Sequence, residues 1–141
     1  MSLFSAIQVS ASGMAAQRTR AEMMVQNMAN SETTRTPEGG PYKRKDVVFA
    51  SDPQGSPFSE ELQYQLEGVR VAQVVEDTQP PDMRYLPGHP DANADGYVAF
   101  PRMNPAEETV NLLSASRSYE ANVSAISAVK DMINHSISIM S

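Results

Sequence analysis

The sequence predicts an α+β protein in which long N- and C-terminal helices pair as a coiled coil beside a small β-rich middle domain. Two observations support this class. All ten prolines and all but one of the seven glycines fall between Pro37 and Pro105, whereas both ends of the chain repeat apolar residues every seven positions. Because proline removes a helical hydrogen bond and clashes with the preceding turn, long helices can form only outside that block. The chain therefore divides into an N-terminal coiled-coil helix (1–30), a β-rich middle domain with loops (31–103) and a C-terminal coiled-coil helix (104–141).

The N-terminal segment is predicted to form one helix with a heptad seam, which is the pattern of a coiled coil. Its main row of seam positions is Ile7, Met14, Ala21 and Met28. A companion row consists of Leu3, Ser10, Gln17 and Met24. Gly13 interrupts the segment at a modest cost in helix stability.

The middle domain is predicted to be a compact sheet with long loops. Runs rich in β-branched and aromatic residues predict strands at 42–50, 62–66, 69–75 and 97–100. Asp82 is expected on a polar loop. More than half of the charged residues lie between Glu32 and Arg102, so this domain is the part of the chain that we expect to face water.

The C-terminal segment opens with a helix start signal. Asn104 can act as the N-cap, Pro105 suits the first helical position, and Glu107 stands where a capping box places its acid. No glycine or proline follows Pro105, so one helix of roughly 50 Å can run to the end. Its main heptad row is Leu112, Tyr119, Ile126, Ile133 and Met140, and its companion row is Ala115, Asn122, Val129 and Ser136.

The outer faces of the C-terminal helix lack the charge that a solvated helix usually carries. Residues 121–129 and 132–141 contain no Asp, Glu, Lys or Arg. Small, uncharged residues on all sides indicate close neighbours on several sides, from other copies or other proteins. The alternative is that the two terminal helices simply pack on each other in a small bundle.

Composition excludes several classes of protein. A net charge of −6 and a pI near 4.8 argue against nucleic-acid binding, which needs a basic surface. No apolar run approaches the ~20 residues that span a bilayer, so no membrane span is expected. The absence of cysteine removes disulfides and thiolate metal sites. The uncharged first 17 residues lack the basic region and unbroken apolar core of a secretory signal, so no cleaved signal peptide is expected.

The run 91–96 begins like the calcium loop of an EF-hand, with Asp91, Asn93, Asp95 and Gly96 in the required order. The twelfth loop position, which needs a bidentate Glu, is instead Arg102, and prolines on both sides exclude the flanking helices. The run is therefore predicted to be a turn, in which Asp-Gly supports a positive φ ahead of the strand at 97–100.

No other pattern in the chain indicates chemistry. The two histidines, His89 and His135, have no partner at metal-ligand spacing, and no nucleophile elbow or phosphate-binding glycine loop is present. The sequence thus predicts no catalytic residue, no metal site and no cofactor. An enzyme that uses Asp91, Asp95 and His89 is an alternative hypothesis that the spacing does not support.

Several motifs resemble those of a known family. The run Asn27-Met28-Ala29-Asn30, the run TTRTP at 33–37 and the run GGPYKRK at 39–45 are similar to the N-terminal signature of bacterial flagellar rod proteins. Upstream, Ser12-Gly13-Met14 and Ala16-Gln17 fit the same signature. The run SASRSYEAN at 114–122 resembles the family's C-terminal signature, and the resemblance covers nearly the whole chain in order.

The resemblance implies a structural role. Proteins of this family are exported unfolded through the flagellar type III apparatus without a cleaved signal, and they assemble into the helical rod that crosses the periplasm. Their terminal helices pair and pack into the inner tube, and the middle domain lies outside. The rod transmits torque, and its lumen carries later subunits outward. The implied partners are other copies, other rod proteins, the rod–membrane-ring junction protein and the export apparatus.

Candidate assembly residues follow from the two seams and from the resemblance. Four polar residues would be buried groups that find partners in the tube and help to set register: Asn27, Asn30, Arg117 and Asn122. The apolar candidates are the seam residues Leu3, Ile7, Met14, Ala21, Met24, Met28, Leu112, Tyr119, Ile126, Val129, Ile133 and Met140. The alternative function is a non-catalytic adaptor or chaperone that grips a partner with its helices.

Overall fold

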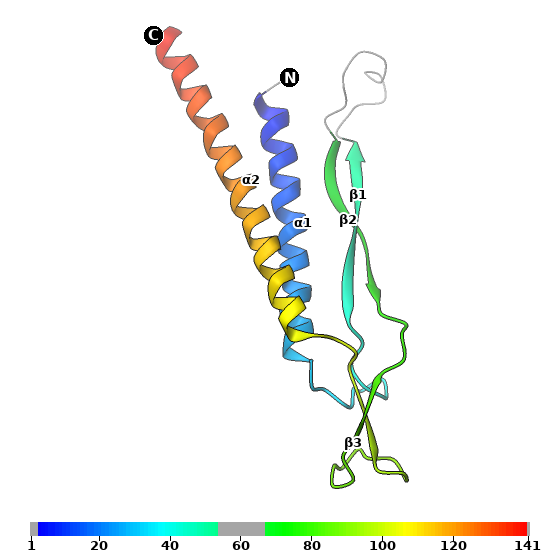
Figure 1. Cartoon of the computed structure of the whole chain (residues 1–141). Helices are drawn as coiled ribbons and strands as arrows, with labels where there is room; N and C mark the ends of the chain where they lie inside the picture. Colours follow the sequence, from blue (N-terminus) through cyan, green and yellow to red (C-terminus); the bar gives the residue numbers. More distant parts are fainter. Residues whose placement is uncertain (1–2, 54–66, 141) are drawn as a thin grey trace.

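A computed structural model describes residues 3–53 and 67–140 (Figure 1). The elements in chain order are α1 (Leu3–Ala29), β1 (Lys45–Pro53), β2 (Glu67–Glu76), β3 (Asp82–Tyr85), β4 (Tyr97–Phe100) and α2 (Pro105–Met140). The predicted α+β class, with long helices at both ends and a small β-rich middle, is confirmed. The strand predicted at 62–66 lies outside the described residues.

The two helices lie side by side and run antiparallel, so that the start of α1 and the end of α2 lie at the same end of the molecule (Figure 1). With 36 residues against 27, α2 is the longer helix. Its start is capped as predicted: the backbone N–H of Ala106 donates to Asn104 Oδ1 at 3.0 Å. The N–H of Glu108 donates to the Asn104 carbonyl at 3.1 Å, which closes the first helical turn.

The strands form two separate antiparallel hairpins. The β1–β2 hairpin lies along α1, on the side away from α2, so α1 is the middle of three layers (Figure 1). The side chain of Ser12 joins two of these layers, because its Oγ accepts a hydrogen bond from the N–H of Val69 at 3.0 Å. The consecutive β1 residues Val48 and Phe49 pair with Gln73 and Val71, so Ala72 is the extra residue of a bulge in β2. Such a bulge is a common device for bending a strand.

The β3–β4 hairpin lies beyond the base of the helix pair. Asp82 pairs with Phe100 at one end and Tyr85 with Tyr97 at the other. The expectation that Asp82 lies on a loop is therefore wrong. Every residue of β3 is exposed, so its sequence does not need to alternate between apolar and polar residues. These four residues, which follow two prolines, therefore carry no strand pattern. The strand predicted at 42–50 begins later, at Lys45.

The core is thin, and the heptad residues that are most buried do not belong to the main rows of the sequence pattern. In α2 the companion residues Ala115 and Val129 are buried, whereas Ile126 is only half-buried and Tyr119 is 37% exposed. In α1 the buried residues are Ala16, Met24 and Asn27, none of which is in the main row. The cause is the third layer. Since α1 packs on both α2 and the β1–β2 hairpin, its buried surface does not follow one stripe.

The two helices nevertheless keep a heptad register. Near the base, Asn27 contacts Glu108; two heptads away along each helix, Gly13 faces Asn122. A Cβ built on Gly13 would lie only 3.1 Å from Asn122 Nδ2. Gly13 is therefore the residue that lets the helices approach closely, which the sequence showed only as an interruption.

Candidate assembly interface

A buried polar cluster joins three segments of the chain at the base of the helix pair. Asn27 has no exposed surface, and its amide makes four hydrogen bonds. Its Nδ2 donates to the Lys45 carbonyl at 2.8 Å and to Glu108 Oε2 at 3.0 Å. Its Oδ1 accepts from the Tyr42 hydroxyl at 3.0 Å and from the Lys45 N–H at 2.9 Å. Every donor and acceptor of this side chain is therefore satisfied within the subunit.

The acid of this cluster is neutralised by an arginine from the loop before β1. Glu108 is 1% exposed, and its Oε1 accepts a hydrogen bond from Arg44 Nε at 2.6 Å. Arg44 also contacts Asp46, with 3.1 Å between Nη1 and Oδ2. A buried carboxylate without such partners would be strongly destabilising. The pair thus fixes the start of α2 against the β1–β2 hairpin.

The cluster also affects a titrating group. Burial raises the pKa of Tyr42, and the negative charges of Glu76 and Glu108 raise it further. The phenol therefore stays protonated, and continues to donate to Asn27, to a higher pH than an ordinary tyrosine would.

Sequence reasoning identified Asn27 as a buried polar residue but missed its partners. Glu108 stands in the first turn of α2, where the helix dipole favours any acid, so its position alone does not mark it as buried. Arg44 belongs to a short basic run with no helical or strand period. One signal in the sequence could have pointed to the cluster. Asn27 lies near the end of one predicted helix and Glu108 near the start of the other, so antiparallel packing of the helices would bring the two together.

The other predicted polar residues are less buried. Asn30 donates to the Gln26 carbonyl at 2.9 Å, a local contact at the end of α1. Asn122 is half-buried beside Gly13 and donates to the Ser118 carbonyl at 2.9 Å. Arg117 is exposed on α2. The structure thus brings Asn27 and Asn122 into contact with the partner helix and leaves Arg117 on the surface.

The predicted apolar residues divide between the helix pair and the surface. Half-buried seam residues are Ile7, Met14, Ala21, Met28, Leu112, Ile126 and Ile133. Of these, Met28 contacts the opposite helix: its Sδ accepts a hydrogen bond from the Thr109 hydroxyl at 3.5 Å. Leu3 and Tyr119 are exposed. The side chain of Met140 lies outside the described part of the structure.

A different stripe of α2 remains available to neighbours. Ala121, Ala125, Ala128 and Met132 are all exposed, and their spacing of four, three and four places them on one helix face. Ile139, 84% exposed, continues the stripe towards the C-terminal end. Since 121–129 carry no charge, this face presents small apolar side chains on which another helix could pack closely. We call Ala121, Ala125, Ala128, Met132 and Ile139 the outer stripe of α2.

The calcium-like run is a turn, as predicted. Gly96 has a φ of +82°, and Asn93 Oδ1 accepts the N–H groups of Asp95 at 3.0 Å and Tyr97 at 2.8 Å. Asp91 Oδ2 accepts from the Thr34 hydroxyl at 2.8 Å. These oxygens therefore hold the loop and the segment after α1 in place.

The described residues also bear on metal binding and on membrane insertion. Across residues 3–53 and 67–140, no three His, Asp or Glu side chains gather as they would around a metal ion. Within those same ranges, neither helix has the length and hydropathy that crossing a bilayer requires.

This chain is similar to known flagellar rod proteins over nearly its whole length. The family described as "Flagellar basal body rod FlgEFG protein C-terminal" matches residues 94–139, which include all of α2 except Met140. The flagellar basal-body rod protein FlgC of Borreliella burgdorferi is 40% identical, and that of Bacillus subtilis is 41% identical; each alignment covers 99% of both chains. FlgC of Salmonella typhimurium is 38% identical over 94% of both chains. The chain belongs to the FlgC family of flagellar basal-body rod proteins.

Proposed function

We propose that this protein is a structural, non-catalytic subunit of the proximal flagellar rod that assembles helically through its terminal helices. The observation that carries the proposal is the outer stripe of α2, an exposed apolar face without charge on the longest element of the chain. A solvated helix normally carries charge on such a face. The stripe therefore indicates a helix that neighbouring subunits cover.

The thin core supports the same proposal. Of the described helix residues, the upper half of α2 contributes only Val129 to the buried apolar set, while Ile137 and Ile139 are exposed. Burying a Met or Ile side chain stabilises a structure by ~1.5–3 kcal/mol, so packing against neighbours would add substantially to the stability of this end. Folding of the open end of the helix pair would then be completed by assembly.

In this arrangement the paired helices form the inner tube and the middle domain lies outside. The tube serves as the drive shaft and as the export channel across the periplasm, and the chain reaches it through the flagellar type III apparatus without a cleaved signal. Its partners are other copies, other rod proteins, the rod–membrane-ring junction protein and the export apparatus. The charged middle domain suits the outer position, because charged side chains keep their hydration there.

A substitution on the outer stripe tests the proposal without disturbing the subunit. Ala128→Asp places a carboxylate on an exposed position, so the free protein should still fold, and the unfolding free energy should fall by no more than the helix-propensity difference of about 0.7 kcal/mol. In cells it should be produced but absent from basal bodies, and the cells should be non-motile. The matched control is Ala106→Asp, the same exchange at an exposed position in the first turn of α2, where negative charge is tolerated.

Two outcomes would count against the proposal. Normal swimming of Ala128→Asp cells would show that the outer stripe is not covered in an assembly. Recovery of the wild-type chain as a discrete complex with one partner, in place of rods, would favour the adaptor hypothesis.

A further inference from the structure

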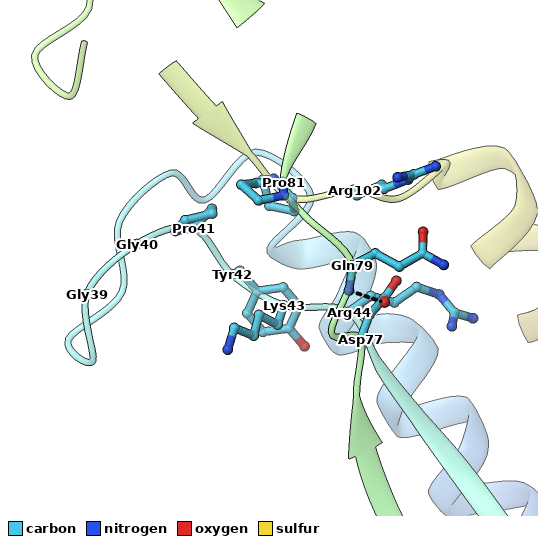
Figure 2. A pocket seen from close by; sticks show the side chains of 11 residues that line it. Gly39, Gly40, Pro41, Tyr42, Lys43, Arg44, Asp77, Gln79, Pro81 and Arg102 are labelled. Carbon is cyan, nitrogen blue, oxygen red and sulfur yellow. Dashed lines mark hydrogen bonds between the residues drawn. The ribbon is translucent and has the colours of Figure 1, made fainter. Parts of the chain in front are cut away.

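A pocket of about 250 Å³ lies in the middle domain, beside the loop before β1. Figure 2 shows the side chains of Lys43 and Arg102 pointing apart on different sides of this pocket. Arg44, which also lines it, is bound by Glu108 and Asp46. The pocket therefore does not present a surface of one charge, whereas the outer stripe of α2 presents uncharged side chains over several helical turns.

Helix α1 carries an exposed stripe of its own. The spacing of its members, which is seven, four, three and four residues, keeps them on one side of the helix. That side differs from the one where Gly13 and Asn27 meet α2. Every member of the stripe is exposed. We call Phe4, Ala11, Ala15, Arg18 and Glu22 the outer stripe of α1.

The outer stripes of the two helices have the same spacing in opposite directions. From Glu22 back to Phe4 the steps are four, three, four and seven residues, and the steps from Ala121 forward to Ile139 are the same. Antiparallel helices can therefore bring all five positions together in one register. Phe4 and Ile139, which face each other in this register, are the two most exposed large apolar residues of the described chain, at 73% and 84%.

The side chains that face one another in this register are complementary in size. At the centre of the contact two alanines meet, so the helix axes can approach closely. On each side of the centre a long side chain faces an alanine, and the aliphatic part of an arginine or glutamate can cover that alanine while its charged end stays in water. The facing pairs are Phe4–Ile139, Ala11–Met132, Ala15–Ala128, Arg18–Ala125 and Glu22–Ala121.

Charge favours the same register. Arg117 is exposed one helical turn before Ala121, and it has no ion-pair partner within the described residues. Glu22 faces Ala121 in this register and so comes within reach of Arg117. Its present partner is Arg18, at 2.9 Å in an exposed pair on α1. Because an exposed pair of this kind contributes little, the carboxylate is available to a second cation.

The register also covers the part of α2 that extends past α1 of the same subunit (Figure 1). Within the subunit Gly13 faces Asn122, whereas in the new contact Ala15 faces Ala128. The α1 helix of a neighbour is therefore displaced by about 8 residues, or ~12 Å, towards the end of α2. Its first turn then lies level with the last turn of α2.

We propose that the outer stripe of α1 of one copy packs antiparallel on the outer stripe of α2 of the next, with Ala15 against Ala128. This inference rests on the proposed assembly into a rod and names the surface that covers the outer stripe of α2. The contact joins two different stripes, so each copy in a chain of contacts keeps one stripe for the copy before it and one for the copy after it. Head-to-tail contacts of this kind propagate into open helical polymers when they do not close a ring.

Engineered disulfides test the contact, because the chain has no cysteine of its own. Two differently tagged versions are produced in one cell, one with Ala15→Cys and one with Ala128→Cys, and isolated basal bodies are oxidised. A disulfide requires Cα atoms within ~7 Å, so the mixed dimer forms only if the two positions meet. In the matched control Ala121→Cys replaces Ala128→Cys, since it lies on the same stripe ~10 Å away along the helix. A second pair, Ala11→Cys with Met132→Cys, repeats the test in the same register.

The expected result is a mixed dimer from positions 15 and 128, and from positions 11 and 132, at a yield several-fold above that from positions 15 and 121. If the versions enter basal bodies but form no mixed dimer, or form only dimers between two copies of Ala128→Cys, the contact is wrong. Protection of the thiol at position 128 from a maleimide in the same basal bodies would then show that another surface covers the stripe and that the proposed function stands. If this thiol reacts as fast in basal bodies as in the monomer, the proposed function fails and the contact fails with it.

Discussion

Asn27 on α1 donates a hydrogen bond to Glu108 on α2 across 3.0 Å, and both side chains are almost completely excluded from solvent. Asn27 lies near the last turn of α1 and Glu108 in the first turn of α2, so the bond closes the base of the antiparallel pair. Through Tyr42, Arg44 and Lys45 the same cluster holds the loop that leads into β1. The relative position of all three layers therefore depends on a few polar groups in place of a large apolar core.

Removing the central amide should be costly. Asn27→Ala leaves the Tyr42 hydroxyl, the Lys45 backbone and Glu108 without partners, and each buried unsatisfied group costs ~1–3 kcal/mol. We expect the unfolding free energy to fall by about 2–4 kcal/mol after partial relaxation, as measured by urea unfolding followed by circular dichroism. Asn134→Ala, on an exposed position of α2, is the control and should be nearly silent. Equal effects of the two variants would contradict the role of the cluster.

The close approach of the helices should appear as coupling between Gly13 and Asn122. Alanine at position 13 would favour the helix by up to ~1 kcal/mol, but its Cβ would press on the Asn122 side chain. We therefore expect Gly13→Ala to stabilise the protein more in an Asn122→Ala background than in the wild type. A double-mutant cycle from unfolding curves measures this difference. Additive effects would show that the two residues do not touch in solution.

The raised pKa of Tyr42 predicts a loss of stability in alkali. The folded state holds the phenol proton more tightly than the unfolded chain, so this contribution is complete below the ordinary pKa of 10.0 and is lost as pH rises through the folded-state pKa. The unfolding free energy should therefore fall above about pH 10 more steeply for the wild type than for Tyr42→Phe. Parallel pH profiles for the two proteins would rule out this linkage.

Order in the free subunit should decrease from the base of the helix pair to its open end. The base carries Met24, Asn27, Glu108 and Ala115, all buried, whereas residues 134–139 are exposed. Amide hydrogen exchange on the purified monomer should show protection near these four residues and little at 3–10 or 130–139. Uniform strong protection along both helices would mean that the subunit needs no neighbours to complete its fold.

The sequence predicted the helices well because their signals are local. Proline distribution marks where helices can exist, and the helix start is marked by Asn104, Pro105 and Glu107, which lie within four positions. The heptad pattern did not show which helix residues are most buried. A heptad pattern assumes that a helix packs on one partner, but α1 packs on both α2 and the β1–β2 hairpin. The β3 strand was missed because it is four residues long and exposed, so neither burial nor alternation marks it.

The site could be predicted only where the type of a residue shows that it needs hydrogen-bond partners when it is buried. A buried Asn requires partners, so Asn27 could be selected, but Glu108 could not, because acids are common in a first helical turn for another reason. The outer stripe of α2 could be suspected from the missing charge. Which face it occupies became clear only once the structure showed that Ala115 and Val129 turn inward and Ala128 outward.

The most direct test of the central claim is the accessibility of the outer stripe of α2 in the free subunit and in the rod. A cysteine at position 128, introduced as Ala128→Cys into the cysteine-free chain, should react quickly with a maleimide in the purified monomer, because Ala128 is exposed. In intact basal bodies the same thiol should be protected, while Ser51→Cys on β1 should react at similar rates in both states. Equal reactivity of the thiol at position 128 in monomer and basal body would contradict the claim that neighbouring subunits cover this helix face.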